Sequence, residues 1–173
     1  DAMARHAQPI NEIRVVDGDS PLFLHYDHRD VGDEPLGHIV ENRHIRGALM
    51  AALAEFPAGA LTWFAPAVMA GLERDSTGVR ATLEDGRTIA ARLVIVAEGR
   101  NSKTREDAGI GVLTWRYSQT GIVCTVAHEK PHRGVAIERF LPAGPFAILP
   151  MTGNRSSLVW TERSDLAPIL LSL

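Results

Sequence analysis

The chain has 173 residues, of which 45% are hydrophobic and 23% are charged, proportions that are ordinary for a globular protein. Its net charge of −3 comes from interspersed acids and bases, which argues against a nucleic-acid-binding surface. The single cysteine, Cys124, excludes an internal disulfide, and no apolar run approaches the roughly 20 residues that span a bilayer.

Both ends of the sequence predict a piece of a longer protein. Residues 1–8 lack an initiating methionine and carry charge where a signal peptide would need an apolar stretch. Residues 169–173 are apolar except for one serine, a pattern that predicts a helix cut short.

The first part of the sequence alternates between extended and helical patterns. Residues 10–16 and 22–26 have the character of two strands joined by a turn. From Asn42 to Phe56 apolar residues recur at helical spacing, which predicts the clearest helix, with Asn42 as its cap. A short strand is predicted at residues 61–64.

Three apolar runs separated by turns then predict a meander between residues 67 and 95. Its last part, residues 93–97, is apolar on both faces, as in strands at the middle of a parallel sheet covered by helices. A short helix is predicted at 102–108, and a final helix should be capped by Ser164 or Asp165. Four more strands are expected at residues 118–127, 135–141, 146–150 and 157–162. The sequence therefore predicts a mixed α/β (α+β) fold.

The most informative segment follows the apolar run 93–97. Glu98 and Gly99 come next, and Ser102 begins the short predicted helix. A glycine at the end of a buried strand lets the backbone pass close to a ligand, and the free amides of a helix start suit a phosphate. A buried strand followed by a tight turn is also common in α/β proteins that bind nothing there.

This segment resembles the second conserved motif of class A flavoprotein monooxygenases, in which an apolar strand runs into Asp-Gly and then Ser-x-x-Arg. Residues 97–102 and Arg105 match that motif, except that Glu98 stands where the family has Asp. The stretch 35–43 resembles the family's segment that leads into the helix beneath the flavin. The stretches 136–150 and 157–161 resemble a sheet that is characteristic of the ubiquinone-biosynthesis branch of this family, and the resemblance as a whole covers residues 7–166.

The resemblance implies an FAD-dependent hydroxylase of a polyprenylated phenol, which uses NAD(P)H and O2 and needs neither a metal nor a protein nucleophile. The residues that it assigns to the cofactor are Asn42, Glu98, Gly99, Arg100, Ser102 and Arg105. In relatives a sheet covers the aromatic substrate, and the matching candidates here are Phe146, Ile148, Leu149, Pro150 and Trp160. Each of these five is also well explained as a plain core residue.

The sequence contains no Gly-x-Gly-x-x-Gly segment and no later Gly-Asp segment, both of which hold FAD in the family. We therefore expect this chain alone to be inactive, to retain no FAD and to self-associate through exposed apolar edges. Residues 1–41 and 109–173 are expected to be parts of a substrate domain, and 42–108 part of the FAD domain. The parent protein is expected in the cytoplasm or peripherally at the inner membrane.

Several other interpretations remain open. The same fold could hydroxylate a simple aromatic acid of the hydroxybenzoate or salicylate type, or the chain could be a non-catalytic β-rich binding module. His25, Asp27 and His28 are close enough to suggest a metal site, but without a third convergent ligand a solvated turn is favoured. Ser102 lacks the Gly-x-Ser-x-Gly surroundings of a nucleophile.

Overall fold

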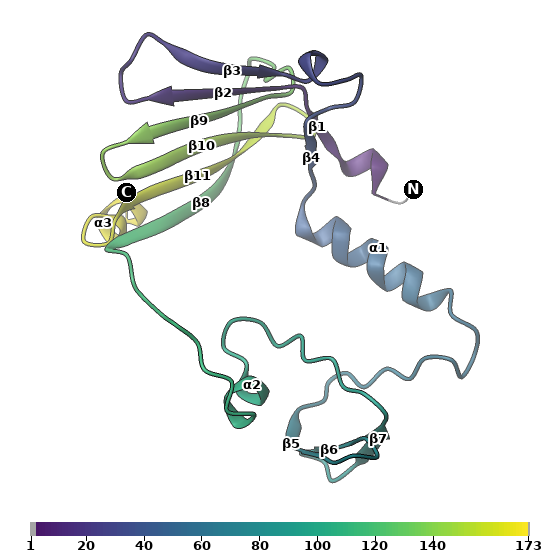
Figure 1. Cartoon of the computed structure of the whole chain (residues 1–173). Coiled ribbons are helices and arrows are strands. Elements are labelled where there is room, and N and C mark those ends of the chain that lie inside the picture. Colours follow the sequence, from purple (N-terminus) through teal and green to yellow (C-terminus); the bar gives the residue numbers. More distant parts are fainter. Residues whose placement is uncertain (1–2, 173) are drawn as a thin grey trace. The chain divides into compact units, whose positions relative to one another are not determined.

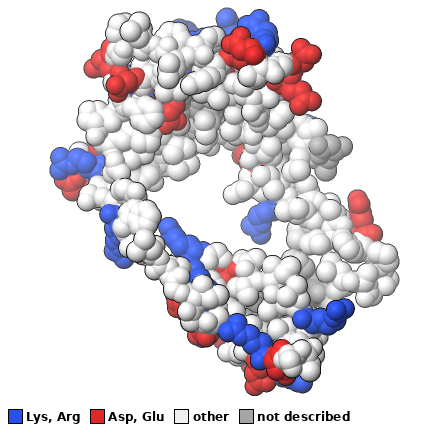
Figure 2. Space-filling view, in the orientation of Figure 1, with Lys and Arg blue, Asp and Glu red and all other residues white. Residues whose placement is uncertain are grey.

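The computed structural model describes residues 3–172 as a mixed α/β chain, which confirms the predicted fold class (Figure 1). The chain divides into two compact units, one formed by Asp1–Phe56 with Tyr117–Leu173 and the other by Pro57–Arg116. The predicted assignment of residues 42–108 to an FAD domain stays a prediction. Acidic and basic side chains are interspersed on the surface seen in Figure 2.

A six-stranded sheet forms most of the larger unit. Its strands lie in the order β3-β2-β9-β10-β11-β8, and all neighbours are antiparallel except β2 and β9, which are parallel (Figure 1). All six strands overlap runs that the sequence predicts, and only their ends differ. Their bounds are β2 (Glu12–Asp17), β3 (Phe23–Asp27), β8 (Gln119–Ala127), β9 (Val135–Leu141), β10 (Gly144–Met151) and β11 (Arg155–Arg163).

Side chains alternate between two faces of this sheet, because successive residues of a strand point to opposite sides. The pairing of β10 with β11 sets Phe146 opposite Trp160 and Leu149 opposite Ser157. One side, which we call the Trp160 face, carries Phe146, Ile148, Pro150, Ser156, Leu158 and Trp160. The other side, which we call the Leu149 face, carries Ala147, Leu149, Met151, Arg155, Ser157 and Val159.

A two-stranded sheet and a helix complete the larger unit. β1 (Gln8–Ile10) pairs with β4 (Gly37–Ile39), and both strands contact β10. β4 leads into α1 (Asn42–Ala54), the helix that the apolar spacing predicts. Its N-cap residue is Glu41, so the prediction that Asn42 caps the helix is wrong. Asn42 is already the first helical residue, and the Glu41 side chain makes no capping hydrogen bond.

The smaller unit contains an antiparallel sheet of three strands in the order β5-β6-β7, which confirms the predicted meander. The short predicted helix is also present as α2 (Lys103–Asp107), with Ser102 at its N-cap. The strand bounds are β5 (Met69–Arg74), β6 (Val79–Leu83) and β7 (Thr88–Ala91).

Two predicted strands of the smaller unit do not form. Residues 61–64 and 93–97 lie in irregular structure. A strand requires a neighbour that supplies backbone donors and acceptors, and between residues 3 and 172 no strand pairs with either segment. Leu93 is 74% exposed and Ile95 is 84% exposed. The predicted buried position of 93–97 in a parallel sheet is therefore wrong within the described chain.

The last helix, α3 (Ala167–Leu171), begins later than predicted. Its N-cap position is Leu166 and no side chain caps it, so the predicted caps Ser164 and Asp165 are wrong. Leu173, the end of the predicted helical run, lies outside the described residues. Among the residues that the structure describes, no helix is long and apolar enough to cross a membrane. Two short 3-10 helices are η1 (Ala4–His6) and η2 (His28–Asp30).

Gly144, at the start of β10, occupies a position that a side chain does not fit. Its φ is +138°, and an added Cβ would lie 2.5 Å from Thr161 Cγ2. We expect Gly144→Ala to lower the free energy of unfolding by about 1–3 kcal/mol, as overpacking does, measured by urea denaturation. Gly121→Ala on β8 is the control, because nothing lies within 4 Å of its added Cβ. Equal losses in both variants would contradict this explanation.

Candidate functional site

A glycine turn and the short helix after it form the candidate site in the smaller unit. The Glu98 carboxylate accepts hydrogen bonds from Ser102 Oγ at 2.6 Å, from Thr104 Oγ1 at 2.9 Å and from the Thr104 amide at 3.0 Å. The side chains of Ser102 and Thr104 are buried. Glu98 therefore satisfies two hydroxyl groups that have lost their contact with water.

These hydrogen bonds correct one prediction about the start of α2. The Thr104 amide donates to Glu98, and the Arg105 amide donates to Ser102 Oγ at 3.1 Å. These two amides, which were expected to be free to bind a phosphate, are thus hydrogen-bonded within the chain. The Ser102 hydroxyl and then the two Thr104 donors hold the pKa of Glu98 below its usual value, so the carboxylate is ionised at neutral pH.

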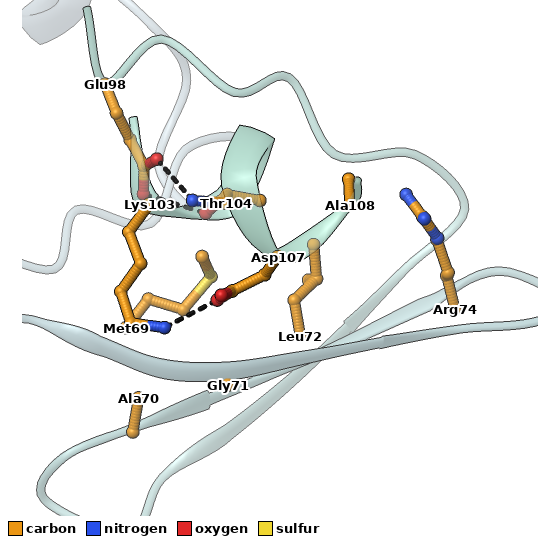
Figure 3. Close-up of a pocket in the computed structure, with 10 residues that line it drawn as sticks. All are labelled: Met69, Ala70, Gly71, Leu72, Arg74, Glu98, Lys103, Thr104, Asp107 and Ala108. Atoms are coloured by element: carbon orange, nitrogen blue, oxygen red, sulfur yellow. Dashed lines mark hydrogen bonds and ion pairs between the residues drawn. The ribbon is translucent and has the colours of Figure 1, made fainter. Parts of the chain in front are cut away.

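A small cavity of about 140 Å³ lies between α2 and β5 (Figure 3). Glu98 lies at its edge, and along α2 the Lys103 Nζ lies 2.6 Å from Asp107 Oδ2. Pockets for cofactors and drug-sized ligands have volumes of roughly 300–1,000 Å³. This cavity is therefore too small for a flavin.

A second cavity, of about 390 Å³, brings together three of the predicted cofactor residues, Gly99, Ser102 and Arg105. Its volume lies in the range of ligand pockets. The rest of its wall is mostly apolar with one further guanidinium group, and is formed by Leu72, Arg74, Val94, Val96, Thr104, Ala108 and Ile110.

The residues of this second cavity fit a cofactor with phosphate groups and an apolar ring system, as FAD has. Gly99 has a φ of +78° and nothing within 4 Å of an added Cβ, so a ligand can approach its backbone closely. Arg105 Nη1 donates to the Arg100 carbonyl at 2.9 Å, whereas Arg105 Nε is buried without a hydrogen-bond partner among the described residues. Arg74 supplies a second positive group at the same wall.

The remaining cofactor predictions, Asn42, Glu98 and Arg100, are not among the residues that line this cavity. Arg100 is exposed and contributes its carbonyl oxygen to Arg105. Asn42 is exposed and belongs to the larger unit, where it is the first residue of α1. The cofactor contacts predicted for Asn42 and Glu98 stay predictions.

The five predicted substrate-pocket residues divide between the two faces of the large sheet. Phe146, Ile148, Pro150 and Trp160 share the Trp160 face, and Leu149 lies on the opposite face. The rings of Phe146 and Trp160 meet edge to face, with centroids 6.0 Å apart. Pro150 is fully buried. One pocket on one face of the sheet therefore cannot contain all five residues.

Arg155 shows which face of the sheet is turned toward the start of α1. Arg155 belongs to the Leu149 face, and its Nη2 lies 3.2 Å from Glu41 Oε2. Since Glu41 directly precedes Asn42, the start of α1 lies on the side of the Leu149 face. Ser157 and Val159 share this face and are not among the predicted pocket residues. The alternation of side chains along β11 puts both residues on one face, but it does not say which face lies toward α1.

The Glu98 carboxylate provides a direct test of how the glycine turn is held. We expect Glu98→Ala to speed hydrogen exchange of the Thr104 and Arg105 amides roughly tenfold. The variant removes the acceptor of the Thr104 amide and of the Ser102 hydroxyl, and that hydroxyl in turn accepts from the Arg105 amide. In the unchanged protein the depressed pKa of Glu98 predicts that this protection is full at pH 7. It should weaken only below the unfolded value of about 4.3 and be lost as the pH falls through the lower folded pKa.

Glu106→Ala is the matched control for this experiment, because Glu106 is on α2, its side chain is 69% exposed, and its carboxylate pairs with Arg105 Nη2 at 3.7 Å rather than with the Thr104 or Arg105 amide. It should leave the exchange rates nearly unchanged. Equal acceleration by Glu98→Ala and Glu106→Ala, or protection in the unchanged protein that is already lost well above a pH of about 4.3, would contradict the proposed role of Glu98.

The chain is similar in sequence to known flavoproteins and to enzymes of ubiquinone biosynthesis. A family model described as an FAD binding domain matches residues 24–166, most of the chain. The ubiquinone hydroxylase UbiL of Rhodospirillum rubrum is 60% identical over all 173 residues, which correspond to 40% of that protein's length. The mitochondrial ubiquinone biosynthesis monooxygenase COQ6 of Homo sapiens is 36% identical, over 93% of this chain and 36% of its own length.

A solved structure supports the fold. PqsL of Pseudomonas aeruginosa, described as a probable FAD-dependent monooxygenase, superposes with a TM-score of 0.84 at 18% sequence identity. The superposition covers 98% of this chain and 47% of PqsL. The chain thus spans less than half the length of each of these relatives. Because the family model matches well over half of its residues, the chain belongs to the FAD-binding domain family.

Proposed function

We propose that this chain is the central part of an FAD-dependent monooxygenase that hydroxylates a polyprenylated phenol in ubiquinone biosynthesis. The observation that carries the proposal is the 60% identity with a ubiquinone hydroxylase along the whole chain. Because the chain spans 40% of that relative, the activity is attributed to the full-length protein that contains it. Membership of the FAD-binding domain family argues against the alternative of a non-catalytic β-rich module.

The bound flavin supplies the oxidative chemistry, and NAD(P)H is the proposed reductant. The contribution of this chain is to bind and to position. Gly99 offers an open backbone approach, and Arg74 and Arg105 place positive charge at the wall of the same cavity. Glu98 keeps the turn in place through its hydrogen bonds to α2. Asn42, at the exposed start of α1, is the proposed contact from the larger unit.

The Leu149 face is the better candidate to cover the aromatic ring of the substrate. If Asn42 contacts the flavin, the substrate must lie on the same side of the sheet as the start of α1. Arg155 places that side at the Leu149 face through its contact with Glu41. Leu149 therefore remains a proposed pocket residue, joined by Ser157 and Val159. On this proposal the Trp160 face lies away from the substrate. That face carries the other four predicted pocket residues, Phe146, Ile148, Pro150 and Trp160.

A substrate with a long prenyl tail resides in a membrane, so we also propose that the full-length protein works at the cytoplasmic surface of the inner membrane as a peripheral protein. Self-association of the isolated chain is part of the same proposal. Exposed apolar side chains on the edge strand β3 favour it, since Phe23 is 53% exposed and Leu24 is 61% exposed.

The proposed activity is tested with the full-length protein, a polyprenylated phenol, NAD(P)H and ¹⁸O-labelled dioxygen. Mass spectrometry should show a hydroxylated product that carries one labelled oxygen atom. Hydroxylation of hydroxybenzoate or salicylate, with no reaction of the prenylated phenol, would instead support the alternative substrate class. Loss of both reactions in a protein that contains its flavin would contradict the proposal.

Leu149 and Ile148 are a matched pair for testing the proposed substrate face, because they are consecutive residues of β10 whose side chains point to opposite faces of the sheet. We expect Leu149→Phe to raise KM for the prenylated phenol roughly tenfold by filling the pocket, with flavin content unchanged. Ile148→Phe adds the same ring on the Trp160 face and should change KM little. A larger effect of Ile148→Phe than of Leu149→Phe would place the substrate on the Trp160 face instead.

A further inference from the structure

Three nitrogen-bearing side chains converge on a single oxygen atom at the start of α1. Glu41 Oε2 lies 2.9 Å from Arg43 Nη2, 3.2 Å from Arg155 Nη2 and 3.8 Å from His44 Nε2. These donors come from α1 and from β11, so two separate elements of the larger unit build the arrangement. With two further neighbours they form what we call the Glu41 cluster, made of Arg5, His6, Glu41, Arg43, His44 and Arg155.

The rest of this cluster adds positive charge without a second carboxylate. His6 and His44 stack with ring centroids 3.6 Å apart and an interplanar angle of 6°. Arg5 Nε donates to His6 Nε2 at 3.0 Å, so the His6 ring is neutral in this geometry. Burial, and then the nearby His44, Arg5 and Arg43, lower the pKa of His6. The cluster therefore holds three guanidinium groups against one carboxylate.

We propose that the Glu41 cluster binds a phosphate-class oxyanion, and that the Glu41 carboxylate occupies part of this site when the anion is absent. Convergent guanidinium and imidazole donors are the groups that recognise phosphate oxygens. Glu41 makes no capping hydrogen bond to α1, so its side chain can turn away without uncapping the helix. This site is additional to the cavity around Gly99 and does not depend on the hydroxylation reaction.

The test is calorimetric titration of the flavin-free full-length protein with inorganic diphosphate at low ionic strength. Arg43→Gln and Arg155→Gln should each weaken binding roughly tenfold, because each removes a charge-assisted donor. Glu41→Gln should bind diphosphate more tightly, because it removes the competing internal anion. Arg163→Gln is the control on the same strand as Arg155. It removes a guanidinium group that pairs with Asp165 at 2.5 Å, and it should leave the affinity unchanged.

Arg43 is 66% exposed at its side chain, so Arg43→Gln tests the site without disturbing a buried contact. Repeating the titration with FAD bound separates two sources of the phosphate. Binding that persists supports a site for a second ligand such as a nicotinamide dinucleotide, and binding that FAD abolishes would overturn the proposal that this site is additional to the flavin cavity. Equal affinities of the unchanged protein, Arg43→Gln and Glu41→Gln would overturn the proposal. The visible flavin spectrum reports cofactor binding separately, so this failure is distinguishable from failure of the proposed function.

Discussion

The contact between Arg155 and Glu41 determines which face of the six-stranded sheet lies toward the start of α1. It joins β11 to the residue before α1 across 114 positions of the sequence. The Arg155 guanidinium is also held by the turn between β10 and β11, through the Thr152 carbonyl at 3.1 Å and the Thr152 hydroxyl at 3.2 Å. The hairpin thus contacts the residue that precedes α1. The proposed substrate face, the proposed flavin contact at Asn42 and the Glu41 cluster all depend on this placement.

Carboxylates position backbone in both units of the chain. Glu98 holds α2 against the glycine turn through three hydrogen bonds, and Glu41 holds the start of α1 against the sheet. Neither carboxylate needs to take part in proton transfer for this purpose. That suits the proposed hydroxylation, in which the difficult chemistry belongs to the cofactor and the protein has to orient the ring and exclude water. The Glu in place of the family's Asp at position 98 reaches both the side chain of Ser102 and the backbone of Thr104.

Local patterns predicted most of the fold. The alternation in β9, β10 and β11 and the apolar spacing in α1 identified these elements because each pattern reflects one buried side of the element itself. The predictions failed where a neighbour decides the outcome. Residues 93–97 are apolar enough for a buried strand, yet nothing in the described chain pairs with them. Asn42 could cap a helix, but the helix begins one residue too early for it to do so.

The candidate site was predictable only in part. Gly99, Ser102 and Arg105 line one cavity because they are neighbours in sequence around one turn, and their contact with the cofactor stays a prediction. Which face of the sheet lies toward α1 was not predictable. The alternation of side chains puts Leu149 and Phe146 on opposite faces but does not say which of the two meets α1. The Glu41 cluster was missed for the same reason, since it combines residues from Arg5 to Arg155.

Photoaffinity labelling tests most directly the proposal that the Leu149 face of the sheet covers the substrate. A polyprenylated phenol that carries a photoreactive group on its ring is irradiated with the flavin-loaded full-length protein, and the labelled residues are mapped by mass spectrometry. The faces alternate along β10 and β11, so each labelled position reports one face. Labels on Leu149, Ser157 or Val159 are the predicted result. Labels on Ile148, Leu158 or Trp160 would contradict the assignment of the substrate to the face that meets α1.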